Sequence, residues 1–199
     1  MKLTNLFGKV LRINADGSIP DNPFNAETTD KYQAIYARGF RNPFSFAVEP
    51  ASPNRIYIND VGEQRWEEIN ELKAGANYGW PRYEGNKGGA GFTRPIFAYK
   101  HDSLPRTSHS TSGCAITGGT FYPPTGVSTP FPPEYQGDYF FADLCNGWIR
   151  KLDVDGESVS GFASDVRSPV DLKIGPDGGL YYLEVGPGTV GVIRPSSSG

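Results

Sequence analysis

The chain repeats a short pattern of residues, and this repetition constrains its fold more than any other feature. Residues 8–17 (GKVLRINADG) align with residues 147–156 (GWIRKLDVDG), and residues 188–195 (GTVGVIRP) give a weaker copy. In each copy apolar residues lead into a basic residue. The two longer copies end in Asp-Gly, which is a strong signal for a tight hairpin turn. The pattern indicates a recurring unit of short strands.

A second repeat pairs residues 43–50 (PFSFAVEP) with residues 169–176 (PVDLKIGP). An aromatic stretch follows each copy, at residues 55–62 and 180–186, and a third aromatic stretch occupies residues 137–143. Apolar and polar residues alternate in the two paired segments, which is typical of half-buried strands. The order of strand, aromatic strand and basic-ending strand therefore recurs along the chain.

Composition supports short strands joined by tight turns. The 199 residues include 25 Gly, 17 Pro, 12 Phe, 11 Tyr and 3 Trp, and this mixture favours turns and buried strands over helices or disorder. We predict an all-β fold, a β-propeller with about three four-stranded antiparallel blades. A β-sandwich is the alternative.

The predicted blades lie around residues 43–71, 115–153 and 169–194, and an isolated strand at residues 8–13 belongs to the middle of an incomplete blade. Three blades are too few to close a ring. We therefore predict a partial β-propeller over residues 1–195 and a polar tail at residues 196–199. Open blade edges favour self-association.

Charge and hydropathy exclude two classes of partner. The formal net charge is −3, which gives no electrostatic footprint for nucleic acid. No apolar run approaches the 18 residues that a membrane-spanning helix needs. Cys114 and Cys145 are the only cysteines; they are either buried free thiols or a disulfide of an exported protein. Both fall beside predicted strands, which favours the disulfide.

Two segments are candidate ligand sites. Arg41 and Asn42 precede the strand that starts at Pro43, and they either form a solvated turn or grip an anionic ligand with a guanidinium and an amide. Carboxylates then cluster in a turn after the aromatic strand; they are Asp60, Glu63, Glu67 and Glu68. This cluster is either a solvated acidic turn or a Ca²⁺ site that includes the carbonyls of Gly62 and Glu63.

Several motifs carry a resemblance to a known family. They are RGFRNP at residues 38–43, DVGEQRWEEIN at 60–70, GANYGWP at 75–81, ITGGTFY at 116–122 and PVDLKIGPDG at 169–178. Together they resemble the glucose/sorbosone dehydrogenases that depend on pyrroloquinoline quinone (PQQ), and the resemblance extends from about Gly8 to Arg194. It matches the C-terminal half of such an enzyme.

The resemblance implies a six-bladed propeller that binds PQQ and Ca²⁺ on its top face. It also implies oxidation of an aldose sugar at C1, transfer of the electrons to an external acceptor, and a periplasmic or secreted location. By position, Arg41 and Asn42 would contact PQQ. The carbonyls of Gly62 and Glu63 would bind the Ca²⁺ that polarises PQQ, and Glu68 with the Tyr78 carbonyl would form a second Ca²⁺ site.

The chain departs from the family pattern in two places. The family's general base is a histidine in an upstream His-x-Gly-Gly segment, which has no counterpart here; His101 and His109 are interpreted as surface-loop residues. Some members also carry a pair of arginines where only Arg167 is found here, so by resemblance Arg167 would be the remaining cofactor contact of that loop. A chain without the base should catalyse poorly by itself.

Two other functions stay open at this point. A propeller without catalytic activity can bind carbohydrate, and loops bearing Trp80, Tyr83 and Phe92 could stack on sugar rings. The chain could instead be a module that binds a protein partner.

Overall fold

The structure is a computed structural model that describes residues 2–52, 55–101, 112–123, 125–128 and 130–195. These residues form strands and three short 3-10 helices. The strands are β1 Lys9–Leu11, β2 Ile35–Arg38, β3 Pro43–Val48, β4 Ile56–Asp60, β5 Trp66–Glu71, β6 Phe97–Lys100, β7 Ile116–Phe121, β8 Tyr139–Asp143, β9 Trp148–Leu152, β10 Val159–Ala163, β11 Pro169–Ile174, β12 Leu180–Glu184 and β13 Thr189–Ile193. The 3-10 helices are η1 Asn25–Glu27, η2 Asp30–Ala34 and η3 Pro133–Tyr135.

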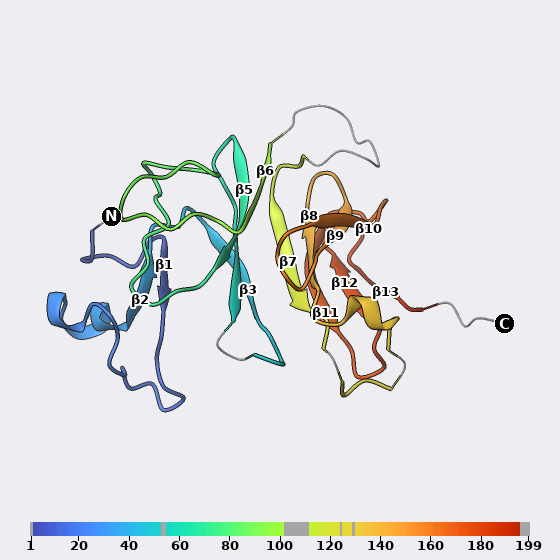
Figure 1. The fold of residues 1–199 in the computed structure, drawn as a ribbon, viewed down its shortest axis with the longest axis horizontal. Helices are drawn as coiled ribbons and strands as arrows, with labels where there is room; N and C mark the ends of the chain where they lie inside the picture. The colour runs from blue at the N-terminus through green and yellow to red at the C-terminus, as the bar shows by residue number, and fades with distance from the viewer. Residues whose placement is uncertain (1, 53–54, 102–111, 124, 129, 196–199) are drawn as a thin grey trace.

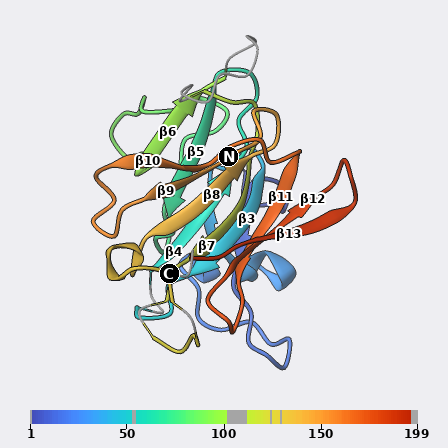
Figure 2. The ribbon, with the colours of Figure 1, turned by 90° about the vertical axis from the view of Figure 1, so that its right-hand side faces the viewer.

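The strands form antiparallel sheets in which each strand pairs with its neighbour in sequence. The first blade has the order β3-β4-β5-β6, the second blade β7-β8-β9-β10 and the third blade β11-β12-β13, while β1 and β2 form a two-stranded sheet. The first strands of the blades are neighbours in space, since β7 contacts both β3 and β11. Figures 1 and 2 show the chain progressing from β1 and β2 through the three blades.

The second blade is covered on both faces, which explains the unbroken aromatic run in β8. Tyr139 and Phe141 pack in a cluster with the first blade, against Tyr57 and Ile69. The alternate residue Phe140 packs in a different cluster, with residues of the third blade. A sandwich of two sheets would leave one face of each sheet to solvent. The fold is therefore the predicted β-propeller, and the β-sandwich alternative is wrong.

The sequence repeats correspond to equivalent strands. Segments 8–17, 147–156 and 188–195 contain β1, β9 and β13, and the latter two are the third strands of their blades. The aromatic segments contain β4, β8 and β12, which are all second strands. Sequence alone did not single out β2, β6 and β10. β6 and β10 are the outer edge strands of their blades, where most side chains are only partly covered, and such strands carry weaker patterns.

The predicted blade content needs one correction. Among the described residues the third blade has three strands rather than four, because no further strand pairs with β13. The sheet of β1 and β2 likewise has two described strands. The tail predicted at residues 196–199 lies outside the described residues.

A carboxylate at the end of the second strand recurs in every blade. Asp60, Asp143 and Glu184 each end their strand and pair with the first residue of the first strand of the same blade. In every blade the carboxylate accepts hydrogen bonds from backbone N–H groups of the segment leading into that first strand. The acceptor of Arg167 N–H, for example, is Glu184 Oε1 at 2.5 Å. The carboxylate therefore fixes the approach of the chain to each blade.

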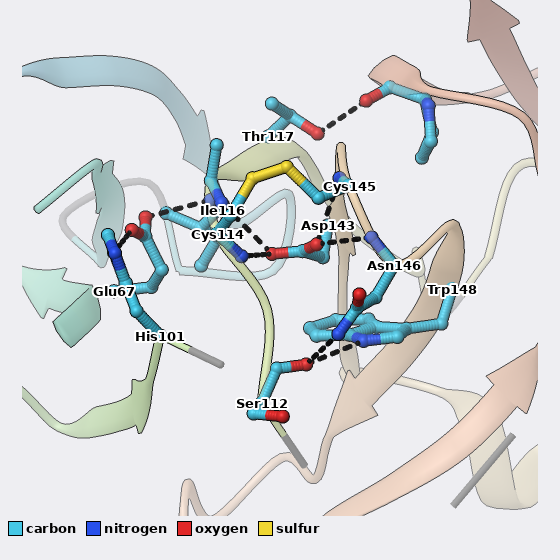
Figure 3. The surroundings of a disulfide bond; sticks show 12 residues. Glu67, His101, Ser112, Cys114, Ile116, Thr117, Asp143, Cys145, Asn146 and Trp148 are labelled. Carbon is cyan, nitrogen blue, oxygen red and sulfur yellow. Dashed lines mark hydrogen bonds and ion pairs between the residues drawn. A yellow bond between two sulfur atoms is a disulfide. The ribbon is translucent and has the colours of Figure 1, made fainter. Parts of the chain in front are cut away.

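Asp143 forms the most extensive of these clamps (Figure 3). Its Oδ2 accepts the N–H of Cys114 at 2.9 Å and that of Ala115 at 3.1 Å. Its Oδ1 accepts the N–H of Cys145 at 3.0 Å and that of Asn146 at 2.8 Å. The side chain is fully buried. One carboxylate thus joins two segments of chain that lie about 30 residues apart.

The predicted disulfide is present at the same place. Cys114 and Cys145 are bonded, with their Cα atoms 5.7 Å apart. Both cysteines donate backbone N–H groups to Asp143. The disulfide and the carboxylate therefore hold the same two segments together, one covalently and one by hydrogen bonds.

We predict that Asp143→Ala lowers the free energy of unfolding by at least about 3 kcal/mol, because four partly buried backbone N–H groups lose their acceptor. Urea unfolding followed by far-UV circular dichroism measures this change. Asp153→Ala is the matched control, since Asp153 also accepts backbone N–H groups but in an exposed turn. Equal losses in the two variants would contradict the role assigned to Asp143.

Replacing both cysteines with alanine should also destabilise the chain. The disulfide spans 31 residues, and opening a loop of that length costs about 3–4 kcal/mol of unfolding free energy in the chain-entropy model. Urea unfolding of the wild type with and without reductant measures the same quantity. The double variant should be insensitive to the reductant; a variant as stable as the oxidised wild type would contradict this prediction.

Candidate cofactor and metal site

The hairpin of β3 and β4 brings the two candidate segments together. Because Pro43 pairs with Asp60, the segment before β3 and the turn after β4 lie at the same end of the first blade. Asp60 Oδ2 accepts the N–H of Arg41 at 3.0 Å, and Oδ1 accepts the N–H of Asn42 at 2.7 Å. The Arg41 guanidinium in turn donates to the carbonyl of Val61 at 3.3 Å.

A small cavity lies where these segments meet. Its volume is about 10 Å³, which is room for about one water molecule or ion. The residues around it include Arg41, Asp60, Gly62, Glu68, Tyr78 and Glu84. The structure thus brings together one predicted cofactor residue and three of the four predicted metal residues. Residues expected for both Ca²⁺ sites line this one cavity: Gly62 from the first, and Glu68 with Tyr78 from the second.

The remaining predicted residues lie elsewhere. Glu63 lines a larger neighbouring pocket. Asn42 has an exposed side chain and binds Asp60 through its backbone. Arg167 belongs to the third blade, where it precedes β11 as Arg41 precedes β3. Their roles in cofactor or metal binding stay predictions.

The carboxylates around the cavity are buried. Asp60 is 4% exposed and Glu68 is 6% exposed. Burial, together with the charge of Glu68, raises the pKa of Asp60 to about 7. Burial likewise raises the pKa of Glu68. Two buried carboxylates that repel each other make a cavity in which a bound cation is favoured.

A further oxygen that has no hydrogen-bond partner in the described part of the chain lies close to Glu68. Glu68 Oε1 accepts the N–H of Gly85 at 2.5 Å, and Oε2 accepts the amide of Asn70 at 3.1 Å. Asn70 Oδ1 is buried and has no hydrogen-bond partner among the described residues. Such an oxygen-rich set suits Ca²⁺ rather than a softer metal. The residues present therefore fit the predicted ion.

The turn after β4 depends on a glycine. A Cβ added to Gly62 would lie 1.7 Å from the carbonyl oxygen of Trp66. No side chain fits at that distance, so only glycine lets the turn fold back over the start of β5. This close approach keeps the backbone of Gly62 at the wall of the cavity.

The solvated-turn interpretation of the acidic cluster is wrong for three of its four members. Asp60, Glu67 and Glu68 are buried, and only Glu63 is exposed. The reason is tertiary: β5 is a middle strand of the first blade, and both of its faces are covered. Alternating residues of β5 therefore point into two different buried environments.

Glu67 faces the second blade, as Figure 3 shows. Its Oε1 contacts Nε2 of His101, and its Oε2 accepts the N–H of Ile116 at 2.8 Å. Burial raises the pKa of Glu67 to about 8, and burial lowers the pKa of His101. The interpretation of His101 as a surface-loop residue is wrong, because it is half-buried and bridges to Gly113. His109 lies outside the described residues.

Sequence reasoning missed two residues of this region. Glu84 lines the cavity and accepts the N–H of Glu63 at 2.8 Å; no pattern in the sequence points to it. The sequence could have pointed to Asp143, because the repeat aligns the ends of the two aromatic strands and therefore places Asp143 opposite Asp60. The alignment showed the position but not its role as an acceptor.

Comparison with known proteins identifies the family. The model of the glucose/sorbosone dehydrogenase family matches residues 1–190, so the chain belongs to that family. It is 32% identical to the aldose sugar dehydrogenase YliI of Escherichia coli K12, over 91% of this chain and 49% of that protein.

Two solved structures share the fold of this chain. The soluble aldose sugar dehydrogenase of Escherichia coli in its apo form superposes with a TM-score of 0.72 and 28% identity, covering 91% of this chain and 52% of that one. The PQQ-bound aldose sugar dehydrogenase of Streptomyces coelicolor superposes with a TM-score of 0.67 and 22% identity, covering 98% and 50%; at this identity it shows the shared fold. The chain spans about half the length of these relatives.

The structure also bears on membrane association. Among the residues that it describes, no helix is both long enough and apolar enough to cross a bilayer.

Proposed function

We propose that the chain forms part of a PQQ- and Ca²⁺-dependent dehydrogenase that oxidises an aldose sugar at C1. The observation that carries the proposal is the cavity shared by Arg41, Gly62, Glu68 and Tyr78. Membership of the sugar dehydrogenase family supports the substrate class. The PQQ in the Streptomyces coelicolor relative supports the cofactor.

Different residues at this end of the first blade would bind PQQ and Ca²⁺. The exposed guanidinium of Arg41 suits a carboxylate of PQQ, and the exposed amide of Asn42 offers donors beside it. Arg167 would contribute from the third blade. The carbonyls of Gly62, Glu63 and Tyr78 with the Glu68 carboxylate would hold Ca²⁺. When bound, PQQ supplies the oxidising power by accepting the hydride from C1 of the sugar.

No described residue is assigned as the general base. His101 Nε2 is engaged with the buried carboxylate of Glu67, so it is not free to take a proton from a sugar hydroxyl. The reaction would therefore depend on a base contributed by another part of the whole enzyme. An external electron acceptor would reoxidise the cofactor, and the disulfide suits the periplasmic or secreted location that we propose.

Dye-linked oxidation of aldoses by a protein that contains this chain tests the proposal. Activity that requires both PQQ and Ca²⁺ is the expected result. Absence of turnover with both present would contradict it. Sugar binding without any PQQ binding would favour the alternative, a carbohydrate-binding propeller without catalysis.

We predict that Glu68→Gln weakens Ca²⁺ binding by at least about tenfold, because the cavity loses a charged ligand while the bond from Gly85 can persist. Terbium luminescence measures this directly, since Tyr78 and Trp80 line the cavity and can sensitise the ion. Glu157→Gln, in an exposed turn, is the control. A terbium titration that is the same for wild type and Glu68→Gln would refute the assignment.

We predict that Arg41→Ala weakens PQQ binding by about 10- to 100-fold, the scale of a lost charge-assisted hydrogen bond. Arg41→Lys should restore only part of this, because lysine lacks the planar fork of donors. Quenching of tryptophan fluorescence by PQQ measures the affinity. Arg94→Ala, at another exposed arginine, should bind PQQ as the wild type does; equal affinities in all three variants would rule out the Arg41 contact.

A further inference from the structure

A larger pocket adjoins the proposed metal cavity and has no role in the function described so far. Its volume is about 560 Å³, within the range of about 300–1,000 Å³ typical of small-molecule sites. Trp66, Trp80 and Tyr83 supply aromatic surface to its lining. Trp80, Tyr83 and Glu84 also line the metal cavity. The two spaces therefore share a wall.

Backbone hydrogen bonds hold the aromatic wall in place. The N–H of Trp80 donates to the carbonyl of Gly39 at 2.9 Å, and the N–H of Tyr83 donates to the carbonyl of Gly79 at 3.0 Å. The ring of Tyr83 also packs edge-on against Phe92, with ring centroids 4.8 Å apart. The Tyr83 ring and the backbone that carries Trp80 are thus positioned before any ligand arrives, which lowers the entropic cost of binding.

Trp66 is held by an equally close contact. A Cβ added to Gly85 would lie 2.6 Å from Cδ2 of the indole, so the backbone at Gly85 lies directly on the ring. Gly85 is itself fixed by its hydrogen bond to Glu68. The second tryptophan of the pocket therefore has a defined position as well.

The rim of the pocket is polar and of mixed charge. Arg65, Arg82 and Lys87 are cationic, Glu63 is anionic, and Gln64 is neutral; all five side chains are exposed. The rim therefore offers hydrogen-bond donors and acceptors together. This combination suits a neutral ligand with many hydroxyl groups better than an ion of either sign.

We propose that this pocket is a carbohydrate subsite in which a sugar ring stacks on Trp80, with Trp66 forming part of the pocket wall, while the hydroxyl groups of the sugar bond to the rim. A pyranose ring has an apolar C–H face that matches an indole and an equatorial edge of hydroxyls that matches a polar rim. That this subsite lies beside the sugar ring that is oxidised rests on the proposed dehydrogenase function. Sugar binding itself needs neither PQQ nor Ca²⁺.

The tryptophans provide a built-in reporter for the test. The chain has three tryptophans, of which two line the pocket, while Trp148 is buried and donates its Nε1–H to the carbonyl of Ser112 at 3.2 Å. Titrating the 199-residue chain with maltotriose or cellotriose, in EDTA and without PQQ, should change its fluorescence. The same change in Trp148→Phe would assign the signal to the pocket.

Isothermal titration calorimetry of variants completes the experiment. Trp80→Ala and the exposed Arg82→Ala should each weaken trisaccharide binding, Trp80→Ala by at least about tenfold, while Arg94→Ala binds as the wild type does. Thermal unfolding confirms that each variant is folded. No heat and no fluorescence change with either trisaccharide would overturn the subsite, as would equal affinity in Trp80→Ala.

Failure of the carbohydrate subsite can be distinguished from failure of the proposed dehydrogenase function. Trisaccharide binding by a chain that shows no affinity for PQQ would support the subsite and count against the dehydrogenase proposal. PQQ binding that is lost in Trp80→Ala and Arg82→Ala but kept in Arg41→Ala would place the cofactor, not sugar, in this pocket and overturn the inference.

Discussion

The structure depends on one recurring interaction, the acceptance of backbone N–H groups by a carboxylate at the end of each second strand. The segment that leads into the first strand of a blade has backbone N–H groups that form no hydrogen bond within a sheet. Such groups need another acceptor when they are removed from water. A carboxylate with two oxygens satisfies several at once. Asp60 and Asp143 do this in the first two blades, and Glu184 accepts a single N–H, in an exposed position, in the third. In the first blade the same bonds place Arg41 beside the turn at Gly62, so the candidate site follows from the interaction that orders the blade.

Coverage of both faces of a blade is the second constraint. In β5 the two neighbouring glutamates point to opposite sides and meet different partners. Glu67 contacts His101 and Ile116 at the junction with the second blade, whereas Glu68 lines the proposed metal cavity. Burial explains why these carboxylates have raised pKa values. The contact between the blades and the candidate binding site thus lie on opposite faces of the same strand.

Much of the fold could be predicted from the sequence, because repeated segments occupy repeated positions. The second strands of all three blades, the first strands β3 and β11 and the third strands β9 and β13 were visible as aligned motifs, and the position of the two cysteines beside strands favoured a disulfide. The outer edge strands β6 and β10 were missed, since most of their side chains are only partly covered and show no clear alternation. For the site, the motif around Arg41 and the cluster around Glu68 were found. The partners Glu84 and Gly85 were not, because they reach the site through a loop whose path no local pattern specifies.

The sequence by itself determined the repeating β architecture, the family and the residue types available for a cofactor and a cation. Local pattern is sufficient for these, because alternation, turn residues and motifs are properties of neighbouring positions. Only the tertiary structure decided that Asp60, Glu67 and Glu68 are buried rather than solvated and that His101 is engaged. It also decided that Arg41, Gly62 and Tyr78 share one cavity. These outcomes depend on which faces neighbouring blades cover, and that is set by packing between segments far apart in the chain.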